Sequence, residues 1–246
     1  MTRRHPRAIA LVIACGLTLA SPARIHPHAL SGESDSAAGV REFTVDDAWG
    51  RDTVEFRTTA PLEDIVGTTN QVTGKLKADP KNLAGASTTA RFEVDLTGIR
   101  TGIDLRDGHV AKALGADKTP TAVLTLDRIK SASPAVLEPG VPADLSGEGT
   151  FQLKGASHKV DVKARVTYVP KGTPASQLRP GNLLKVVADF DVKLADYGVE
   201  RKGAVLPLQV GETAHVTATL LASDATPEEN KPYRDSAVKY LGKARK

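Results

Sequence analysis

The chain has 246 residues, of which 40% are hydrophobic and 25% are charged, and its formal net charge is +4. Residues 1–23 contribute +3 and residues 227–246 contribute another +3, which leaves −2 for residues 24–226. A nearly neutral body with five Phe, four Tyr and one Trp lacks the basic surface and the stacking platforms of nucleic-acid-binding domains, so we expect no nucleic-acid partner.

The first 23 residues have the pattern of a secretory signal peptide. Three arginines, Arg3, Arg4 and Arg7, precede an apolar run over residues 8–20, and small residues follow directly. This run is shorter than the roughly 20 residues that a membrane-spanning helix needs. We therefore predict that residues 1–23 are removed and that the mature protein is periplasmic or secreted.

Cys15, the only cysteine of the chain, offers an alternative to this ordinary cleavage. Residues 12–15, Val-Ile-Ala-Cys, resemble the lipobox at which bacterial lipoproteins are cut and acylated, and acylation would anchor the protein to a membrane through Cys15. Cleavage near Ala20 or Ala23 is favoured, because lipobox processing would leave only residues 8–14 as the apolar run. A disulfide within the chain is excluded in both cases.

Residues 24–41 are expected to form a flexible linker, because they lack periodicity and are rich in small polar residues. His26 and His28 lie in this segment, but two ligands in a mobile stretch are too few for a closed metal site. We expect neither a metal nor a cofactor.

From residue 52 the chain alternates apolar and polar side chains, which is typical of half-buried strands. Val54 and Phe56 share one face of a first strand, and Ala60-Pro61 ends it. Two further strands are predicted over residues 66–77 and 86–96.

Residues 103–114 are predicted to form a short helix in the middle of the chain. Ile103, Val110 and Leu114 recur at roughly helical spacing, and Thr101 with Asp104 resembles a capping box. Gly108 costs such a helix about 1 kcal/mol relative to Ala, so we expect the helix to depend on packing against one end of a larger β-structure.

The second half of the body again reads as strands. They are predicted after Pro120 and over residues 145–154, 160–168, 183–194 and 216–220, with a hairpin between 145–154 and 160–168. The connections are too short or irregular for repeated parallel crossovers, and about eight strands result. The predicted fold is all-β, an extended antiparallel eight-stranded barrel with one short central helix.

The alternation also predicts which apolar side chains face the barrel interior. They are Val54, Phe56, Val72, Leu76, Phe92, Val94, Leu124, Leu126, Phe151, Leu153, Val162, Phe190, Val192, Val216 and Leu220. A barrel of eight strands can be filled by such side chains or can hold one small ligand, and the pattern alone does not separate the two.

Several short motifs follow one another in order within residues 43–222. They are Gly74-Lys-Leu-Lys-Ala-Asp79, Arg106-Asp-Gly-His109, Pro120, Gly149-Thr-Phe-Gln-Leu-Lys-Gly155 with Lys159-Val160, Asp196-Tyr-Gly-Val199 and Val210-Gly-Glu212. In these motifs and their spacing the chain resembles the YceI family of exported bacterial lipid-binding proteins, which are extended, lipocalin-like barrels. The resemblance implies a barrel domain over residues 42–222 whose interior holds a polyisoprenoid or similar long-chain amphiphile.

Arg106 and His109 lie three residues apart on the predicted helix, so both could contact a phosphate or other polar headgroup at the barrel mouth. The alternative, which we favour, is that they only hydrogen-bond nearby loop backbone. The chain has no Gly-x-Ser-x-Gly elbow, His-Glu-x-x-His helix or Gly-rich phosphate loop, so we do not expect an enzyme.

Residues 223–246 are expected to form a C-terminal tail that is helical in part. Pro227 suits the first turn of a helix, whereas Pro232 is expected to interrupt it. An apolar stripe beside the basic residues could contact an anionic membrane, although a solvated, frayed terminus is favoured. The stripe is Tyr233, Ala237, Tyr240 and Leu241.

Two functions follow from these observations. The first is an exported protein that carries or sequesters a polyisoprenoid or similar amphiphilic lipid in the barrel. The second is an envelope interaction module whose barrel is filled and binds no lipid.

Overall fold

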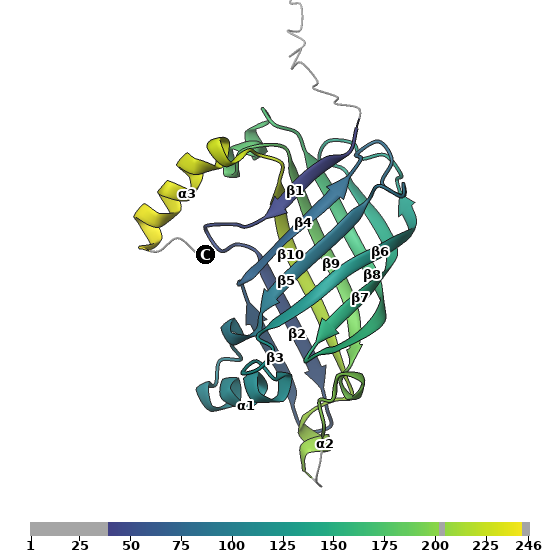
Figure 1. The fold of residues 1–246 in the computed structure, drawn as a ribbon, viewed down its shortest axis with the longest axis vertical. Coiled ribbons are helices and arrows are strands. Elements are labelled where there is room, and N and C mark those ends of the chain that lie inside the picture. The colour runs from purple at the N-terminus through teal and green to yellow at the C-terminus, as the bar shows by residue number, and fades with distance from the viewer. Residues whose placement is uncertain (1–38, 202–204, 243–246) are drawn as a thin grey trace, which may run out of the picture. The chain divides into compact units, whose positions relative to one another are not determined.

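A computed structural model of the chain describes residues 39–201 and 205–242. The predicted signal peptide, Cys15 and most of the predicted linker lie outside these residues. Ten antiparallel strands form one sheet in the order β1-β4-β5-β6-β7-β8-β9-β10-β2-β3 (Figure 1). They are β1 (Arg41–Val45), β2 (Thr53–Thr59), β3 (Asp64–Thr69), β4 (Val72–Ala78), β5 (Thr89–Asp95), β6 (Thr121–Ser133), β7 (Pro142–Leu153), β8 (Ala156–Val169), β9 (Leu183–Lys193) and β10 (Thr213–Ser223).

Eight of these strands close into a barrel. β1 pairs with β4 over its length and meets β10 through Thr44 and Ser223, which joins the two ends of the series β4 to β10. The remaining hairpin, β2–β3, pairs with residues 214–219 of β10 and extends the wall at one end. The predicted all-β, antiparallel eight-stranded barrel is confirmed.

The strands differ from the predicted ones in two places. The alternation does not reveal β1, which has five residues. Residues 66–77, predicted as a single strand, contain the end of β3 and most of β4, separated by Asn70 and Gln71. β3 pairs with β2, whereas β4 pairs with β1 and β5. Alternation reports which face a residue takes, so a change of partner strand leaves no mark in the pattern.

The predicted hairpin between β7 and β8 is present, with Leu153 paired to Ala156. Its two turn residues, Lys154 and Gly155, have φ values of 52° and 83°. Two consecutive positive φ angles match the right-handed twist of the flanking strands, which explains the tight connection.

The central helix is α1 (Asp104–Leu114), and it flanks one end of the barrel (Figure 1). Its N-cap residue is Ile103, which offers no side-chain cap, so the expected capping role of Thr101 is wrong. The Thr101 hydroxyl instead donates to the Asp107 carboxylate at 2.6 Å. A short helix, α2 (Leu206–Gln209), lies at the same end. Three 3₁₀ turns complete the connections: η1 (Leu96–Gly98), η2 (Pro174–Leu178) and η3 (Leu194–Tyr197).

The C-terminal helix α3 (Pro227–Leu241) lies beside the opposite end of the barrel (Figure 1). Thr226 and Glu229 form a capping box at its start. The helix continues through Pro232, so the expected interruption is wrong. A proline removes one backbone hydrogen bond, and tertiary contacts compensate here, because Ala237 is fully buried and Tyr233 donates to the Asp47 carboxylate.

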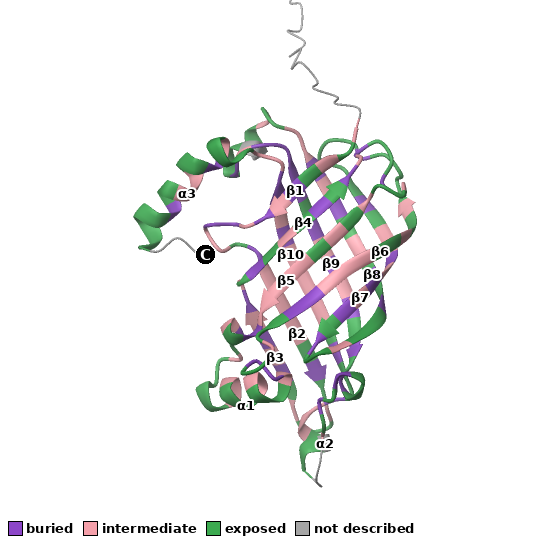
Figure 2. Ribbon diagram, in the orientation of Figure 1, coloured by how far each residue is buried: buried purple, intermediate pink, exposed green. Residues whose placement is uncertain are grey.

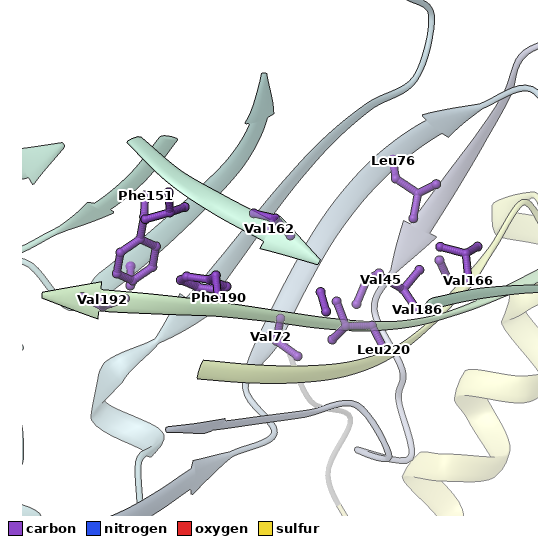
Figure 3. Close-up of a cluster of buried hydrophobic side chains, with 14 of the residues drawn as sticks. Val45, Val72, Leu76, Phe151, Val162, Val166, Val186, Phe190, Val192 and Leu220 are labelled. Atoms are coloured by element: carbon purple, nitrogen blue, oxygen red, sulfur yellow. The ribbon is translucent and has the colours of Figure 1, made fainter. Parts of the chain in front are cut away.

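Burial follows the alternation along the strands, with exposed residues on the outer face and buried or half-buried residues on the inner face (Figure 2). Figure 3 shows part of the inner face, where side chains from β1, β4 and β7 to β10 point toward one another. These are Val45, Val72, Leu76, Phe151, Val162, Val166, Val186, Phe190, Val192 and Leu220. In the described part of the chain, no helix is both long and apolar enough to cross a bilayer.

Candidate binding cavity

The barrel interior contains a cavity of 590 Å³ at the end that carries α1 and α2. Its volume lies in the range of small-molecule binding sites. Three of the lining residues, Ile103, Leu105 and Leu206, are also exposed at the surface of the protein. The cavity therefore reaches solvent between α1 and α2.

The cavity wall is built by strands that align apolar residues in register. Phe92 of β5 pairs with Leu124 of β6, which pairs with Phe151 of β7. On the other side, Val216 of β10 pairs with both Phe56 of β2 and Phe190 of β9. These pairs place large apolar side chains at the same height of the barrel, which gives the cavity a continuous apolar wall.

Two glycines let aromatic rings lie flat along this wall. A Cβ atom at Gly67 would lie 2.3 Å from the ring of Phe56, and one at Gly74 would lie 2.4 Å from the ring of Phe92. Backbone without a side chain is therefore required beneath both rings. The two phenylalanine rings therefore pack directly against the backbone of the neighbouring strand.

Twelve of the fifteen residues predicted to face the interior line this cavity. They are Val54, Phe56, Val72, Phe92, Val94, Leu124, Phe151, Leu153, Phe190, Val192, Val216 and Leu220. The other three, Leu76, Leu126 and Val162, line a separate pocket of 80 Å³ in the opposite half. The structure therefore places all fifteen residues inside the barrel. Contact between these residues and a ligand stays a prediction.

A partition separates the two spaces. Phe92, Leu124 and Ala188 border both the cavity and the small pocket. Beyond the partition the interior is nearly filled, so the barrel is hollow in one half and packed in the other.

The two predicted headgroup residues are brought together at the cavity mouth. Arg106 and His109 both line it from α1. Arg106 already has partners: its Nη1 atom lies 2.5 Å from Oε1 of Glu63, and its Nη2 atom donates to the carbonyl of Thr101 at 3.0 Å. The favoured interpretation, a hydrogen bond to loop backbone, therefore applies to Arg106, which also binds Glu63. An anionic headgroup would compete with Glu63 for the Arg106 guanidinium.

Several mouth residues were not predicted from the sequence. Glu63, Glu200, Arg201 and Gln209 line the mouth, and Arg201 donates to the Glu212 carboxylate at 2.9 Å. Most of them lie in turns and in the 199–210 segment, which has no strand or helix period. The signal that could have found this segment is its apolar content, because Val205, Leu206 and Leu208 are apolar residues that belong to no alternating strand pattern.

The described residues do not form a recognisable catalytic or metal centre. Among them, no group of three or more His, Cys, Asp or Glu side chains is placed to hold a metal ion. His215 lies on the outer face of β10, where its Nδ1 atom is 2.8 Å from Asp191. The ring of His158 packs edge-on against the ring of Tyr197. Burial raises the pKa of the Tyr197 hydroxyl to about 12. The cavity wall is thus mostly apolar, and the charged side chains among its lining residues lie at its mouth.

Comparison with known proteins places this geometry in a family context. The family model described as YceI-like domain matches residues 43–222. A polyisoprenoid-binding domain from Saccharophagus degradans superposes with a TM-score of 0.54 at 19% identity, covering 75% of this chain and 99% of that one. BcnA from Burkholderia cenocepacia superposes with a TM-score of 0.52 at 17% identity, covering 73% of this chain and 99% of its own. No curated protein sequence matches the chain significantly.

Proposed function

The chain belongs to the YceI-like family, and from this premise we propose that it is an exported protein that binds the hydrocarbon tail of a polyisoprenoid or similar amphiphilic lipid inside the barrel. The observation that carries the proposal is the apolar cavity of 590 Å³ that opens between α1 and α2. The polyisoprenoid-binding domain from Saccharophagus degradans, which shares the fold, supports the ligand class.

The size of the cavity suits a single chain. A methylene group is close in size to a water molecule, and at about 30 Å³ each a volume of 590 Å³ takes on the order of 20 carbon atoms. Burial contributes about 0.8 kcal/mol per methylene, so such a tail gains on the order of 16 kcal/mol before the cost of ordering it is subtracted. Tight binding requires no catalytic group.

The polar end of the lipid would remain at the mouth. The ionisable side chains that line the mouth are Glu63, Arg106, His109, Glu200 and Arg201. The Arg106–Glu63 pair is partly exposed, so a headgroup reaches it without burying a charge deeply. We assign these residues no catalytic role: Arg106 is paired with Glu63 and Arg201 with Glu212.

Export is the second part of the proposal. It is supported by the signal-like pattern of residues 1–23. Acylation at Cys15 is the alternative that would keep the protein on a membrane. Mass analysis of the mature N-terminus distinguishes these outcomes.

Binding is tested by native mass spectrometry of gently purified protein before and after organic extraction, followed by titration with a polyisoprenoid. Ala218 lines the cavity, so Ala218→Trp is expected to fill it and to weaken binding at least tenfold. The matched control is His215→Trp, which places the same side chain on the exposed face of β10.

An unchanged mass with no extractable lipid, together with no uptake in the titration, would favour the filled-barrel interaction module instead. Equal binding by the Ala218→Trp variant and the His215→Trp control would show that the cavity is not where the lipid binds.

A further inference from the structure

Six large apolar side chains are exposed around the opening of the cavity. They come from the β2–β3 turn, from α1 with its N-cap residue, and from the segment of α2. We call them the mouth rim: Leu62, Ile103, Leu105, Val205, Leu206 and Leu208. Leu62 and Leu105 are 70% and 73% exposed, which is unusual for two leucines so near a binding site.

The mouth rim is continuous with the cavity wall. Ile103, Leu105 and Leu206 belong to both. Leu62 is joined to the α2 side by a backbone hydrogen bond of 2.9 Å from its N–H to the carbonyl of Leu208. Figure 2 shows α1 and α2 as largely exposed elements at this end of the barrel. Apolar side chains therefore continue from the outside of the protein into its hollow half through the three shared residues.

Four ion pairs lie beside the mouth rim. Arg106 pairs with Glu63, Arg57 with Asp64, Arg100 with Asp107 and Arg201 with Glu212. These four pairs contain as many acidic as basic groups, so they offer no net positive field toward an anionic surface. An occupant that covers this face must be recognised through its apolar character.

We propose that the mouth rim inserts into the hydrocarbon boundary of a lipid bilayer, so that a lipid tail passes from the membrane into the cavity without crossing water. The proposal rests on the proposed function, because it supplies the route by which the ligand reaches the cavity. A bilayer fits better than a protein partner, since the rim surrounds an opening and a protein covering it would close the path of the ligand.

The mode of docking is insertion rather than charge attraction. Peripheral proteins that bind through basic patches depend on anionic lipids and are released by salt. A rim of aliphatic side chains with internally paired charges gains affinity from apolar area buried in the interface. Docking is therefore expected to be nearly independent of anionic lipid and of ionic strength.

The test separates docking from binding. Two measurements use a dansyl-labelled farnesyl amphiphile: its equilibrium dissociation constant in solution, and its rate of transfer to the protein from phosphatidylcholine vesicles. The variant is Leu62→Glu/Leu208→Glu, because neither side chain lines the cavity. The matched control is Leu178→Glu, at a leucine that is 63% exposed and whose carbonyl accepts from Arg51, which also contacts Tyr233 of α3.

The double variant is expected to bind the soluble probe within twofold of the wild type and to accept it from vesicles at least tenfold more slowly, while Leu178→Glu behaves as wild type. The wild-type transfer rate should rise with vesicle concentration and change less than twofold with added phosphatidylglycerol or salt.

Three results would overturn the proposal while leaving the proposed function intact. They are normal transfer by the double variant, a wild-type rate that is independent of vesicle concentration, and a strong salt dependence. A dimer that the double variant abolishes would also overturn it, with a second copy of the chain as the occupant. Failure of the wild type to bind the soluble probe would instead contradict the proposed function.

Discussion

The two ends of the barrel differ in how fully their interiors are packed. At the α1–α2 end the inner wall is half-buried and encloses 590 Å³ of space, and its charged groups lie at the cavity mouth. At the α3 end the interior is packed, with Phe43, Val45 and Leu83 almost fully buried. Loops 79–88 and 134–141 cover this end and are tied together by a hydrogen bond of 2.7 Å from the N–H of Leu137 to the carbonyl of Pro80.

The packed end also contains a buried polar network where the barrel closes. β10 changes its partner from β2 to β1 near Leu221, which pairs with Lys185 of β9 on one side but has no paired strand residue on the other. Asp52 accepts the N–H of Leu221 at 2.7 Å, and Arg179 donates to its carbonyl at 2.5 Å. Arg179 also pairs with Asp46 in the connection between β1 and β2. Charged side chains thus replace missing strand contacts.

This network holds α3 against the barrel. Burial alone would raise the pKa of Asp47, but hydrogen bonds from Arg51 and Tyr233 outweigh it and lower the pKa. Arg234 of α3 donates to Asp46 at 2.8 Å. The comparison indicates that contacts at the α3 end contribute more to the free energy of unfolding than contacts at the α1–α2 end. At the α1–α2 end the interior is incompletely packed, which leaves room for a ligand.

The largest expected effect comes from breaking the network. Arg179→Met removes a guanidinium with no exposed surface and leaves the carbonyls of Leu221 and Thr44 without their donor. Loss of one partner of a buried ion pair costs about 3–5 kcal/mol, which urea unfolding would measure. Arg165→Met, which breaks an exposed pair with Asp144, should cost less than about 1 kcal/mol. Equal losses in the two variants would contradict the comparison.

A pair of identical truncations then compares the two interiors directly. Phe43 is fully buried at the packed end, so Phe43→Ala should reduce the free energy of unfolding by about 3–5 kcal/mol. Phe56 borders the cavity and is half-buried, so Phe56→Ala should cost about 1–2 kcal/mol without ligand. Chemical denaturation of both variants tests this, and similar costs would mean that the hollow half is as well packed as the other.

The third prediction concerns the pH dependence of the packed end. Burial raises the pKa of Asp52 to about 6, from 3.8, and the charge of Asp47 adds to the rise while Arg179 opposes it. The folded protein keeps this proton to higher pH than the unfolded chain, so the stabilisation is complete below about pH 4 and is lost as pH rises through 6.

Asp52→Asn carries no titrating proton at this position. Its free energy of unfolding, relative to wild type, should therefore rise by about 2 kcal/mol between roughly pH 4 and pH 7. Asp144→Asn is the control: Asp144 is exposed, and its hydrogen bond from Arg165 lowers the pKa, so its trend should be small and of opposite sign. A difference between Asp52→Asn and wild type that does not change with pH would contradict the prediction.

The smallest expected effect is on the attachment of α1. The Lys154 ammonium donates to the carbonyls of Ala113 and Gly198 at 3.2 and 2.8 Å, which ties the end of α1 to the β7–β8 turn. Lys154→Met should cost less than about 1 kcal/mol, because the side chain is exposed. Hydrogen exchange should become faster in α1 and stay unchanged in α3.

The control for this variant is Lys159→Met, which removes an exposed ion pair with Asp127 from the barrel wall. Faster exchange in α1 of both variants, or in neither, would show that Lys154 does not fasten the helix.

The candidate site was predictable to the extent that it depends on strand faces. Period-two alternation predicted the inward side chains, and twelve of those fifteen line the cavity. It did not predict Glu63, Arg201 or Leu206, because turns and short helices have no period that reveals where their side chains lie. It also missed the change of partner at Asn70 and Gln71, which depends on which strands meet in space.

The sequence by itself determined the strand faces, the central helix and the antiparallel barrel, since these follow from local periodicity and short connections. Only the tertiary structure decided which half of the barrel is hollow, because that depends on how side chains from distant parts of the chain pack across the interior. It also decided how the barrel closes, since Asp52 and Arg179 reach Leu221 from distant parts of the chain, and contacts between distant residues carry no local pattern.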